Sequence, residues 1–289
     1  MMSHTNQTPI PLDKGQAPKW RQWIKSERAF WLFLLMPALI ILFAVFIYPL
    51  LYSLYLSLTS YNLIMPPRFV GLRNYIKILS DPQVLSSIRV TLVFTFWALA
   101  LELIIGFAIA LILHDLEVLR DFFRTVSAIP LMMTPVVIGV VWRVMGNYDY
   151  GVFNYLLGLI GVDKMGWVIN ANLAMAYLII SDVWHTTGFV VLALSAGLAQ
   201  LPQEMYEAAE VDGANFFHQL RFLTIPLLTP VFSVVIIFRL YNLIRMFDKA
   251  MSLTSGGPGH ATTTMSFYIY KRMFDGWQVG YSSAVAIIL

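Results

Sequence analysis

Residues 30–58 read FWLFLLMPALIILFAVFIYPLLYSLYLSL, an apolar run without a single charged side chain. A helix that crosses the hydrocarbon core of a bilayer needs about 20 apolar residues, so this run is long enough to span a membrane. It is too long for the apolar region of a secretory signal peptide, and no convincing small-residue cleavage site follows it. We therefore expect it to be an uncleaved first span.

Four more apolar runs follow, at roughly 88–113, 124–145, 172–198 and 226–247, and a sixth begins near Gly280. Backbone groups in lipid must be satisfied within the chain, and continuous runs without polar alternation favour helices over barrel strands. The sixth run reaches Leu289 after ten residues, too few to cross a bilayer. The predicted fold is therefore an all-α polytopic membrane protein with six transmembrane helices, the last cut off at residue 289. We expect the natural chain to continue for about 10–15 more apolar residues.

The composition excludes several classes of protein. Only 12% of the residues are charged and 58% are hydrophobic, whereas a soluble domain carries about 25% charged residues. The absence of cysteine excludes disulfides, thiolate metal sites and a cysteine nucleophile. The net charge of +3 comes without a cluster of basic and aromatic residues, so we expect no nucleic-acid partner. The five histidines lack the spacing of metal ligands, and no metal site is predicted.

Basic residues near the span ends favour one orientation only slightly. The polar segment 1–28 carries five, and the first loop with the edge of the next span carries four. Since positive charge is retained on the cytoplasmic side, the N-terminus is mildly expected inside. Within the first loop, Leu72, Tyr75, Ile76 and Leu79 share one helical face, which we expect on the membrane surface. Asp81-Pro82 is typical of a helix start.

The connection between the fourth and fifth runs has a pattern of its own. Residues 200–226 read QLPQEMYEAAEVDGANFFHQLRFLTIP. Pro202 suits a first helical position and Gly213 a C-terminal cap, so we expect a short helix over 202–212 and a second over 214–223. Small and apolar side chains share one face, and Glu204, Glu207 and Glu210 lie mostly on another. These residues alone leave two readings open, a partner-binding loop and a solvated amphipathic loop.

The spacing of this segment resembles a known family. Glu207-Ala208-Ala209, three residues, Gly213, nine residues and then Leu223-Thr224-Ile225-Pro226 resemble the EAA loop of the permease subunits of binding-protein-dependent ABC importers. The family pattern is Glu-Ala-Ala, x3, Gly, x9, Ile-x-Leu-Pro, and this chain exchanges Ile and Leu at 223 and 225. The stretches FVGLRNY at 69–75 and LTSGGPG at 253–259 resemble the carbohydrate-uptake branch, of the maltose and glycerol-3-phosphate type.

The resemblance implies the ABC type I importer permease fold and a transport function. It implies a coupling loop at 200–226 that docks a cytoplasmic ATPase, with Glu207, Ala208, Ala209, Gly213, Ile225 and Pro226 as its residues. A domain division follows, with 1–28 as a cytoplasmic polar segment and 29–289 as the permease domain of a multi-pass protein in a prokaryotic cytoplasmic membrane. The implied partners are a second permease subunit, two ATPase subunits and an extracytoplasmic solute-binding protein.

The resemblance also implies that this chain is not itself an enzyme. It has no Gly-x-x-x-x-Gly-Lys-Ser/Thr loop, so we expect no cofactor here and ATP with Mg²⁺ on the partner ATPase. The implied solute is an oligosaccharide, a polyol or a glycerol phosphate.

Polar residues inside the spans are candidates for the solute pathway, because ionisable groups in a membrane usually face a cavity or a partner. In the resembling family the solute site draws on the part of span 5 just before the 253–259 stretch, which favours Asn242 and Arg245. Tyr241 and Trp184 could stack on a sugar, and Asp182 is a further candidate. The alternative is pairing between helices, such as Arg245 with Asp182 or Asp248. For Glu102 and His185 a structural role is favoured over solute contact.

Two other functions compete with this interpretation. An ion-coupled secondary transporter could use Asp182 and His185, three residues apart, as a proton relay. An intramembrane serine protease could use Gly280-Tyr281-Ser282 with His185 or His260 as its base. A lone Gly-x-Ser is a weak pattern, and transport that is sensitive to vanadate but not to a protonophore would exclude the secondary transporter.

Overall fold

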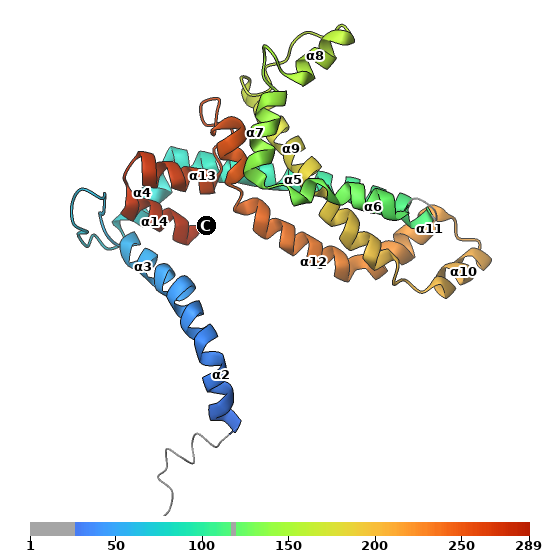
Figure 1. Cartoon of the computed structure of the whole chain (residues 1–289), viewed down its shortest axis with the longest axis horizontal. Helices are drawn as coiled ribbons and strands as arrows, with labels where there is room; N and C mark the ends of the chain where they lie inside the picture. The colour runs from blue at the N-terminus through green and yellow to red at the C-terminus, as the bar shows by residue number, and fades with distance from the viewer. Residues whose placement is uncertain (1–26, 117–119) are drawn as a thin grey trace, which may run out of the picture. The chain divides into compact units, whose positions relative to one another are not determined.

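A computed structural model describes residues 27–116 and 120–289 of the chain, and these are helical almost throughout (Figure 1). The only β-bridge among them joins Thr59 and Phe69. The chain divides into two compact units, residues 1–55 and 56–289, each of which is described by itself. Nearly all of the predicted polar segment 1–28 lies outside the described residues.

The first unit is built from the opening apolar run. Helix α2 (Glu27–Leu42), the π-helical turn η1 (Phe43–Ile47) and α3 (Tyr48–Ser57) follow one another without a break. Residues 30–57 are long and apolar enough to cross a membrane. No side chain from 30 to 55 is buried within the described chain, so this helix presents apolar surface all round, as expected of a membrane span.

The second unit holds the remaining elements. In chain order these are α4 (Arg73–Ser80), α5 (Pro82–Asp115), α6 (Arg120–Ala128), η2 (Pro130–Met132), α7 (Pro135–Met145), α8 (Val152–Leu159), α9 (Ala171–Leu198), α10 (Gln203–Val211), α11 (Phe216–Gln219), η3 (Leu220–Thr224), α12 (Ile225–Ile244), η4 (Ala250–Thr254), α13 (Met265–Tyr270), η5 (Lys271–Asp275) and α14 (Val279–Ile288). Asp81 caps α5, because its carboxylate accepts a hydrogen bond from the Gln83 N–H at 2.9 Å. On the predicted apolar face, the capping residue Leu72 and the helical residues Ile76 and Leu79 of α4 are exposed, whereas Ile78 of α4 is buried.

The all-α membrane fold is confirmed, with one change to the third span. Among residues 27–116 and 120–289, four helices are long and apolar enough to cross a membrane: 30–57, 82–114, 171–198 and 216–244. The run predicted as one helix over 124–145 is bent by 93° between 121–132 and 135–145. Pro130 and Pro135 lie at this bend, and proline lacks the N–H that a continuous helix needs. A count of six spans is consistent with these helices if the bent pair and the short α14 are each one span.

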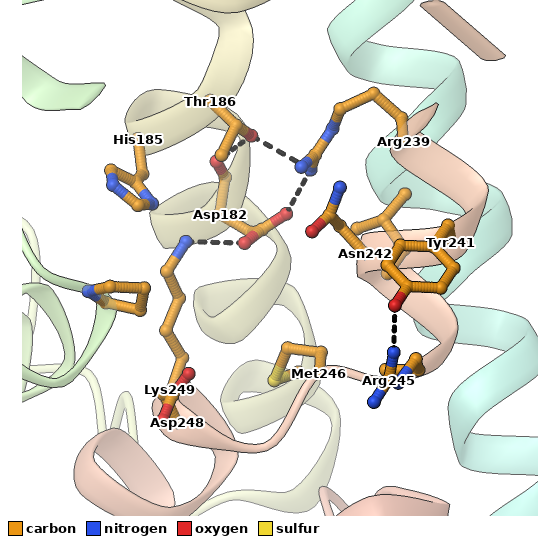
Figure 2. A pocket seen from close by; sticks show the side chains of 12 residues that line it. Asp182, His185, Thr186, Arg239, Tyr241, Asn242, Arg245, Met246, Asp248 and Lys249 are labelled. Atoms are coloured by element: carbon orange, nitrogen blue, oxygen red, sulfur yellow. Dashed lines mark hydrogen bonds and ion pairs between the residues drawn. The ribbon is translucent and has the colours of Figure 1, made fainter. Parts of the chain in front are cut away.

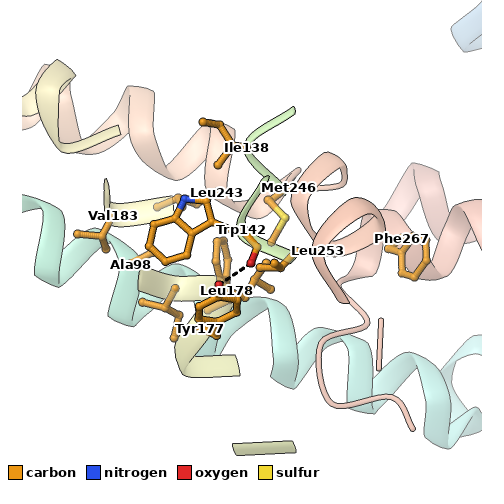
Figure 3. Packing of buried hydrophobic residues seen from close by; sticks show 13 residues of the cluster. Ala98, Ile138, Trp142, Tyr177, Leu178, Val183, Leu243, Met246, Leu253 and Phe267 are labelled. Atoms are coloured by element: carbon orange, nitrogen blue, oxygen red, sulfur yellow. Dashed lines mark hydrogen bonds between the residues drawn. The ribbon is translucent and has the colours of Figure 1, made fainter. Parts of the chain in front are cut away.

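The core of the second unit lies where α5, α7, α9, α12 and η4 meet (Figure 3). Tyr177 of α9 is almost fully buried, and its hydroxyl donates to the Trp142 carbonyl of α7 at 2.5 Å. Gly188 of α9 allows the bent span to come close, since a Cβ there would lie 1.9 Å from the Ser127 carbonyl oxygen. Close backbone packing at small residues is the usual way for helices to associate in a membrane.

Candidate functional site

The predicted coupling loop forms a helix with a defined end. Helix α10 begins after Pro202 and is followed by Gly213 in the left-handed conformation, at φ +80°. The Ala214 N–H donates to the Ala209 carbonyl at 2.9 Å, and the Gly213 N–H donates to the Glu210 carbonyl at 3.0 Å. These two bonds make a Schellman motif, in which glycine is favoured because a side chain strains the left-handed backbone. The hydrogen bonds that end α10 therefore explain why residue 213 is a glycine.

The loop is tied to the membrane helix that follows it. The Tyr206 hydroxyl lies 3.0 Å from the Thr224 hydroxyl, and Pro226 stands in the first turn of α12. With α11 and η3, α12 forms a helical stretch of 29 residues from 216 to 244. In the second unit α10 and α11 lie at the end remote from α13 and α14 (Figure 1). A displacement of α10 would therefore act on the start of a long helix.

The outer surface of the loop is acidic and apolar. Glu204, Glu207, Glu210 and Asp212 are exposed, and none of them forms an ion pair with another described residue. Val211 is 88% exposed and Phe217 is 75% exposed. These exposed apolar side chains and unpaired acids are available for contact with another protein.

A polar cavity lies near the other end of α12. It has a volume of about 340 Å³, within the usual range for small-molecule sites. Its walls come from α9, from the end of α12 and the segment after it, and from the bend in the third span. The lining residues are Pro135, Asp182, His185, Thr186, Arg239, Tyr241, Asn242, Leu243, Arg245, Met246, Asp248 and Lys249 (Figure 2).

Four of the five predicted pathway residues meet at this cavity: Asp182, Tyr241, Asn242 and Arg245. The Asn242 amide donates to the Phe238 carbonyl at 2.8 Å, which leaves its side-chain oxygen as an acceptor. Arg245 donates to the Tyr241 hydroxyl, and its guanidinium lies 4.9 Å from the centroid of that ring.

The fifth predicted residue, Trp184, does not line the cavity. Its ring centroid lies 5.9 Å from that of Trp142, in an aromatic group with Tyr177. Trp184 stands two positions after Asp182, and on a helix that spacing turns side chains to different faces.

A buried ionic cluster supports the floor of the cavity. Arg239 of α12 bonds both oxygens of Glu102 of α5 at 2.6 Å, and it reaches Asp182 of α9 at 2.9 Å. Lys249 donates to the other oxygen of Asp182 (Figure 2). Glu102 is 0% exposed, Lys249 2%, Asp182 4% and Arg239 5%. Paired charges of this kind join helices, because breaking one pair leaves an uncompensated charge in an apolar interior.

This cluster corrects one prediction and adds two residues. Asp182 pairs with Arg239 and Lys249, and neither Asp182 nor Asp248 pairs with Arg245. Glu102 is an interhelical partner, as favoured, but Arg239 and Lys249 were not predicted in the site. A signal for Arg239 was present, because it is an arginine in the middle of a span and needs a partner. Lys249 lies beyond the fifth apolar run, where a basic residue is unremarkable.

His185 does not form a relay with Asp182. Its Nε2 lies 3.2 Å from the Met133 carbonyl at the bend of the third span, and its Nδ1 is buried without a partner among the described residues. Ser282, the serine of the protease alternative, is buried, and its hydroxyl has no hydrogen-bond partner in the described chain. The described residues therefore form neither the proton relay of a secondary transporter nor the serine site of a protease.

Comparison with known proteins identifies the family. Residues 102–289 match the model of the binding-protein-dependent transport system inner membrane component. The chain belongs to this family. The resemblance to carbohydrate-uptake permeases is confirmed, and the chain is a permease subunit of an ABC importer in the inner membrane.

Several relatives are similar over most of their length. The chain is 38% identical to the probable ABC transporter permease protein y4oQ of Sinorhizobium fredii, over 94% of this chain and 88% of that protein. It is 37% identical to the trehalose/maltose transport system permease protein MalF of Thermococcus litoralis, over 88% and 86%. It is 31% identical to the sulfoquinovosyl glycerol transport system permease protein SmoG of Agrobacterium fabrum, over 98% and 92%.

A solved structure shows the same fold. The bacterial alginate ABC transporter, solved in complex with an alginate pentasaccharide-bound periplasmic protein, matches with a TM-score of 0.78 and 21% identity. The match covers 93% of this chain and 91% of that one.

Proposed function

We propose that the cavity beside α9 and α12 is the solute site of the permease, and that α10 docks a separate ATPase. The observation that carries the solute site is the meeting of Asp182 of α9 with Asn242 and Arg245 at the end of α12 around one polar cavity in an otherwise apolar bundle. Polar groups inside a membrane protein are costly, and they mark pathways for polar solutes. An amide, a carboxylate and a guanidinium beside a tyrosine ring provide donors, acceptors and a stacking face for a sugar.

The open side of the cavity supports a second permease subunit as a partner. Tyr241 is 59% exposed, and Asn242 and Arg245 are also exposed. A guanidinium and an amide on a spanning helix are unfavourable against lipid. A second subunit placed over this side of α12 would close the cavity and complete its lining.

The solute that we propose is a saccharide. The relatives include proteins named for trehalose/maltose and for sulfoquinovosyl glycerol, and the solved relative carries alginate. The family description, which names binding-protein-dependent transport, supports delivery of the solute by an extracytoplasmic binding protein.

The drive for transport comes, in this proposal, from ATP and Mg²⁺ on two partner ATPase subunits. Glu207, Ala208 and the exposed Val211 would contact the ATPase, and Gly213 shapes the end of that surface. The loop then lies in the cytoplasm, and so does the N-terminus, since an even number of spans separates the two.

Saccharide affinity tests the proposed site. The permease complex is purified with its partner subunits in nanodiscs, and binding of maltose, trehalose and sucrose is titrated by saturation-transfer difference NMR. Asn242→Ala removes an amide at the cavity and should weaken the bound sugar roughly ten-fold. Trp184→Phe changes a side chain outside the cavity and serves as the control. Equal affinities for the wild type and Asn242→Ala would contradict the site.

A further inference from the structure

The charges around the cavity cancel. The buried cluster holds two carboxylates, Glu102 and Asp182, and two cations, Arg239 and Lys249. Glu102 is fully buried and does not itself line the cavity, but it pairs with Arg239, which does. The charged lining residues outside the cluster are Arg245 and Asp248, one of each sign. A charged solute would therefore meet no excess of opposite charge, and burying it would leave one charge uncompensated.

Arg239 keeps one nitrogen available to a solute. Its Nε and Nη2 donate to Glu102, and Nη2 also reaches Asp182 and the Thr186 hydroxyl at 3.0 Å. Its Nη1 donates to no described residue, yet it is not among the unpaired polar atoms that are sealed from solvent. Arg239 lines the cavity, so a solute held there is the group best placed to accept a hydrogen bond from Nη1.

The cluster holds this donor rigidly. The Arg239 side chain is 7% exposed, and its two carboxylate partners come from α5 and α9. Figure 2 shows Lys249, Asp182 and Arg239 in a row across the cavity, with Asn242 beside the guanidinium. A fixed donor next to an amide suits a hydroxyl or ring oxygen, since a pre-organised group loses little entropy when it binds.

We infer that this permease selects an uncharged saccharide, and that Arg239 contacts it directly through Nη1. The inference rests on the proposed solute site and narrows the class of solute. The relatives include transporters named for neutral sugars and for acidic sugars, so the family alone does not decide between them. Two neutralising carboxylates leave Arg239 as a hydrogen-bond donor without free charge to attract an acid.

The first test compares neutral and acidic sugars. Maltose, trehalose, sucrose and cellobiouronic acid are titrated against the purified permease complex in nanodiscs by saturation-transfer difference NMR. At least one neutral disaccharide should bind, and the uronate should bind at least ten-fold more weakly. Binding of the uronate as tightly as the best neutral sugar would overturn the selectivity.

The second test changes the charge behind Arg239. Glu102→Gln removes one negative charge from the cluster and should raise the affinity for the uronate several-fold relative to the neutral sugar. Asp275→Asn makes the same charge change at an exposed residue that does not line this cavity, and it should leave the ratio unchanged. An unchanged ratio in Glu102→Gln would overturn the role of charge balance.

The third test separates contact from structure. Arg239→Lys keeps the positive charge but loses the planar donor Nη1 and the two-point pair with Glu102. The neutral sugar should bind roughly ten-fold more weakly to folded Arg239→Lys, and with close to wild-type affinity to Glu102→Gln, which disturbs the same pair but keeps Nη1. Unaltered affinity would overturn the contact. If Asn242→Ala weakens binding and Arg239→Lys does not, only this inference fails; if neither variant changes binding, the proposed site fails as well.

Discussion

The acidic residues of α10 and those of the buried cluster carry the same chemical group in opposite settings. Glu204, Glu207 and Glu210 are exposed and form no ion pair with the rest of the described chain, whereas Glu102 and Asp182 are buried and each is bonded to a cation. The buried acids join α5, α9, α12 and the segment after α12. Acids without an internal partner contribute little to the fold of this chain and are available to another protein.

This difference in burial and pairing predicts whether a substitution acts on a partner or on the fold. An exposed ion pair is worth about 0–1 kcal/mol, so changes on α10 should leave the fold intact and act on a partner. Removal of one member of a buried pair costs about 3–5 kcal/mol, so changes in the cluster should act on the fold first.

The largest expected effect is the loss of transport in Glu207→Lys. A reversed charge on the docking surface should abolish uptake of labelled saccharide, while the amount of permease in the membrane stays at the wild-type level. Asp163→Lys makes the same change at an exposed residue outside the coupling loop, and it should transport normally. Normal uptake by Glu207→Lys would mean that the exposed acids of α10 serve no partner.

Arg239→Met should have the largest effect on stability. It leaves Glu102 and Asp182 with one cation between them, and we expect the purified permease to lose about 3–5 kcal/mol, measured by denaturant unfolding. Arg245→Met, six residues further along, is the matched control, because Arg245 is exposed and forms no ion pair with a described residue. Equal stability of the two variants would remove the distinction between the buried and the exposed charges.

Gly213→Ala should have a moderate effect that is confined to the loop. A Cβ at Gly213 meets no other atom within 4 Å, so the cost comes only from its left-handed backbone. That cost is about 1 kcal/mol, which should weaken binding of the purified ATPase subunit roughly five-fold. Gly158→Ala in α8 has equally open surroundings without a positive φ, and its ATPase affinity should match that of the wild type.

Asp81 is half-buried, between the exposed acids of α10 and the buried acids of the cluster. Its substitution should have the smallest effect on stability. Burial raises its pKa, but hydrogen bonds from Tyr281, the Gln83 N–H and Tyr268 outweigh burial, so the pKa of Asp81 lies below its ordinary value. A carboxyl with a lowered pKa in the folded state stabilises the protein above its unfolded pKa, and this stability is lost as the pH falls through the folded value. Asp81→Asn should therefore lower the melting temperature slightly at neutral pH, and the difference should shrink as the pH falls below the ordinary aspartate pKa of about 3.9. A difference that persists at low pH would show that the charge of Asp81 is not what stabilises this region.

The bend in the third span shows what prolines in a sequence can and cannot predict. The apolar run predicted a helix over 124–145, and Pro130 and Pro135 were visible in it. Prolines are tolerated in membrane helices where neighbours satisfy the freed backbone groups. Whether they kink or break a helix depends on what packs against them, here Gly188 and His185 of α9.

Apart from the bend in the third span, the apolar spans and the capped coupling helix could be predicted from the sequence, because they depend on hydropathy and on hydrogen bonds between residues close in the chain. Its polar residues within the spans made Asp182 a candidate for the solute pathway, and the resemblance to the permease family favoured Asn242 and Arg245. Only the tertiary structure decided which charges pair. Glu102 and Arg239 are 137 residues apart, and the choice of Arg239 over Arg245 as the partner of Asp182 depends on how α5, α9 and α12 pack. That packing decides which cation reaches the buried carboxylates and which stays at the open side of the cavity.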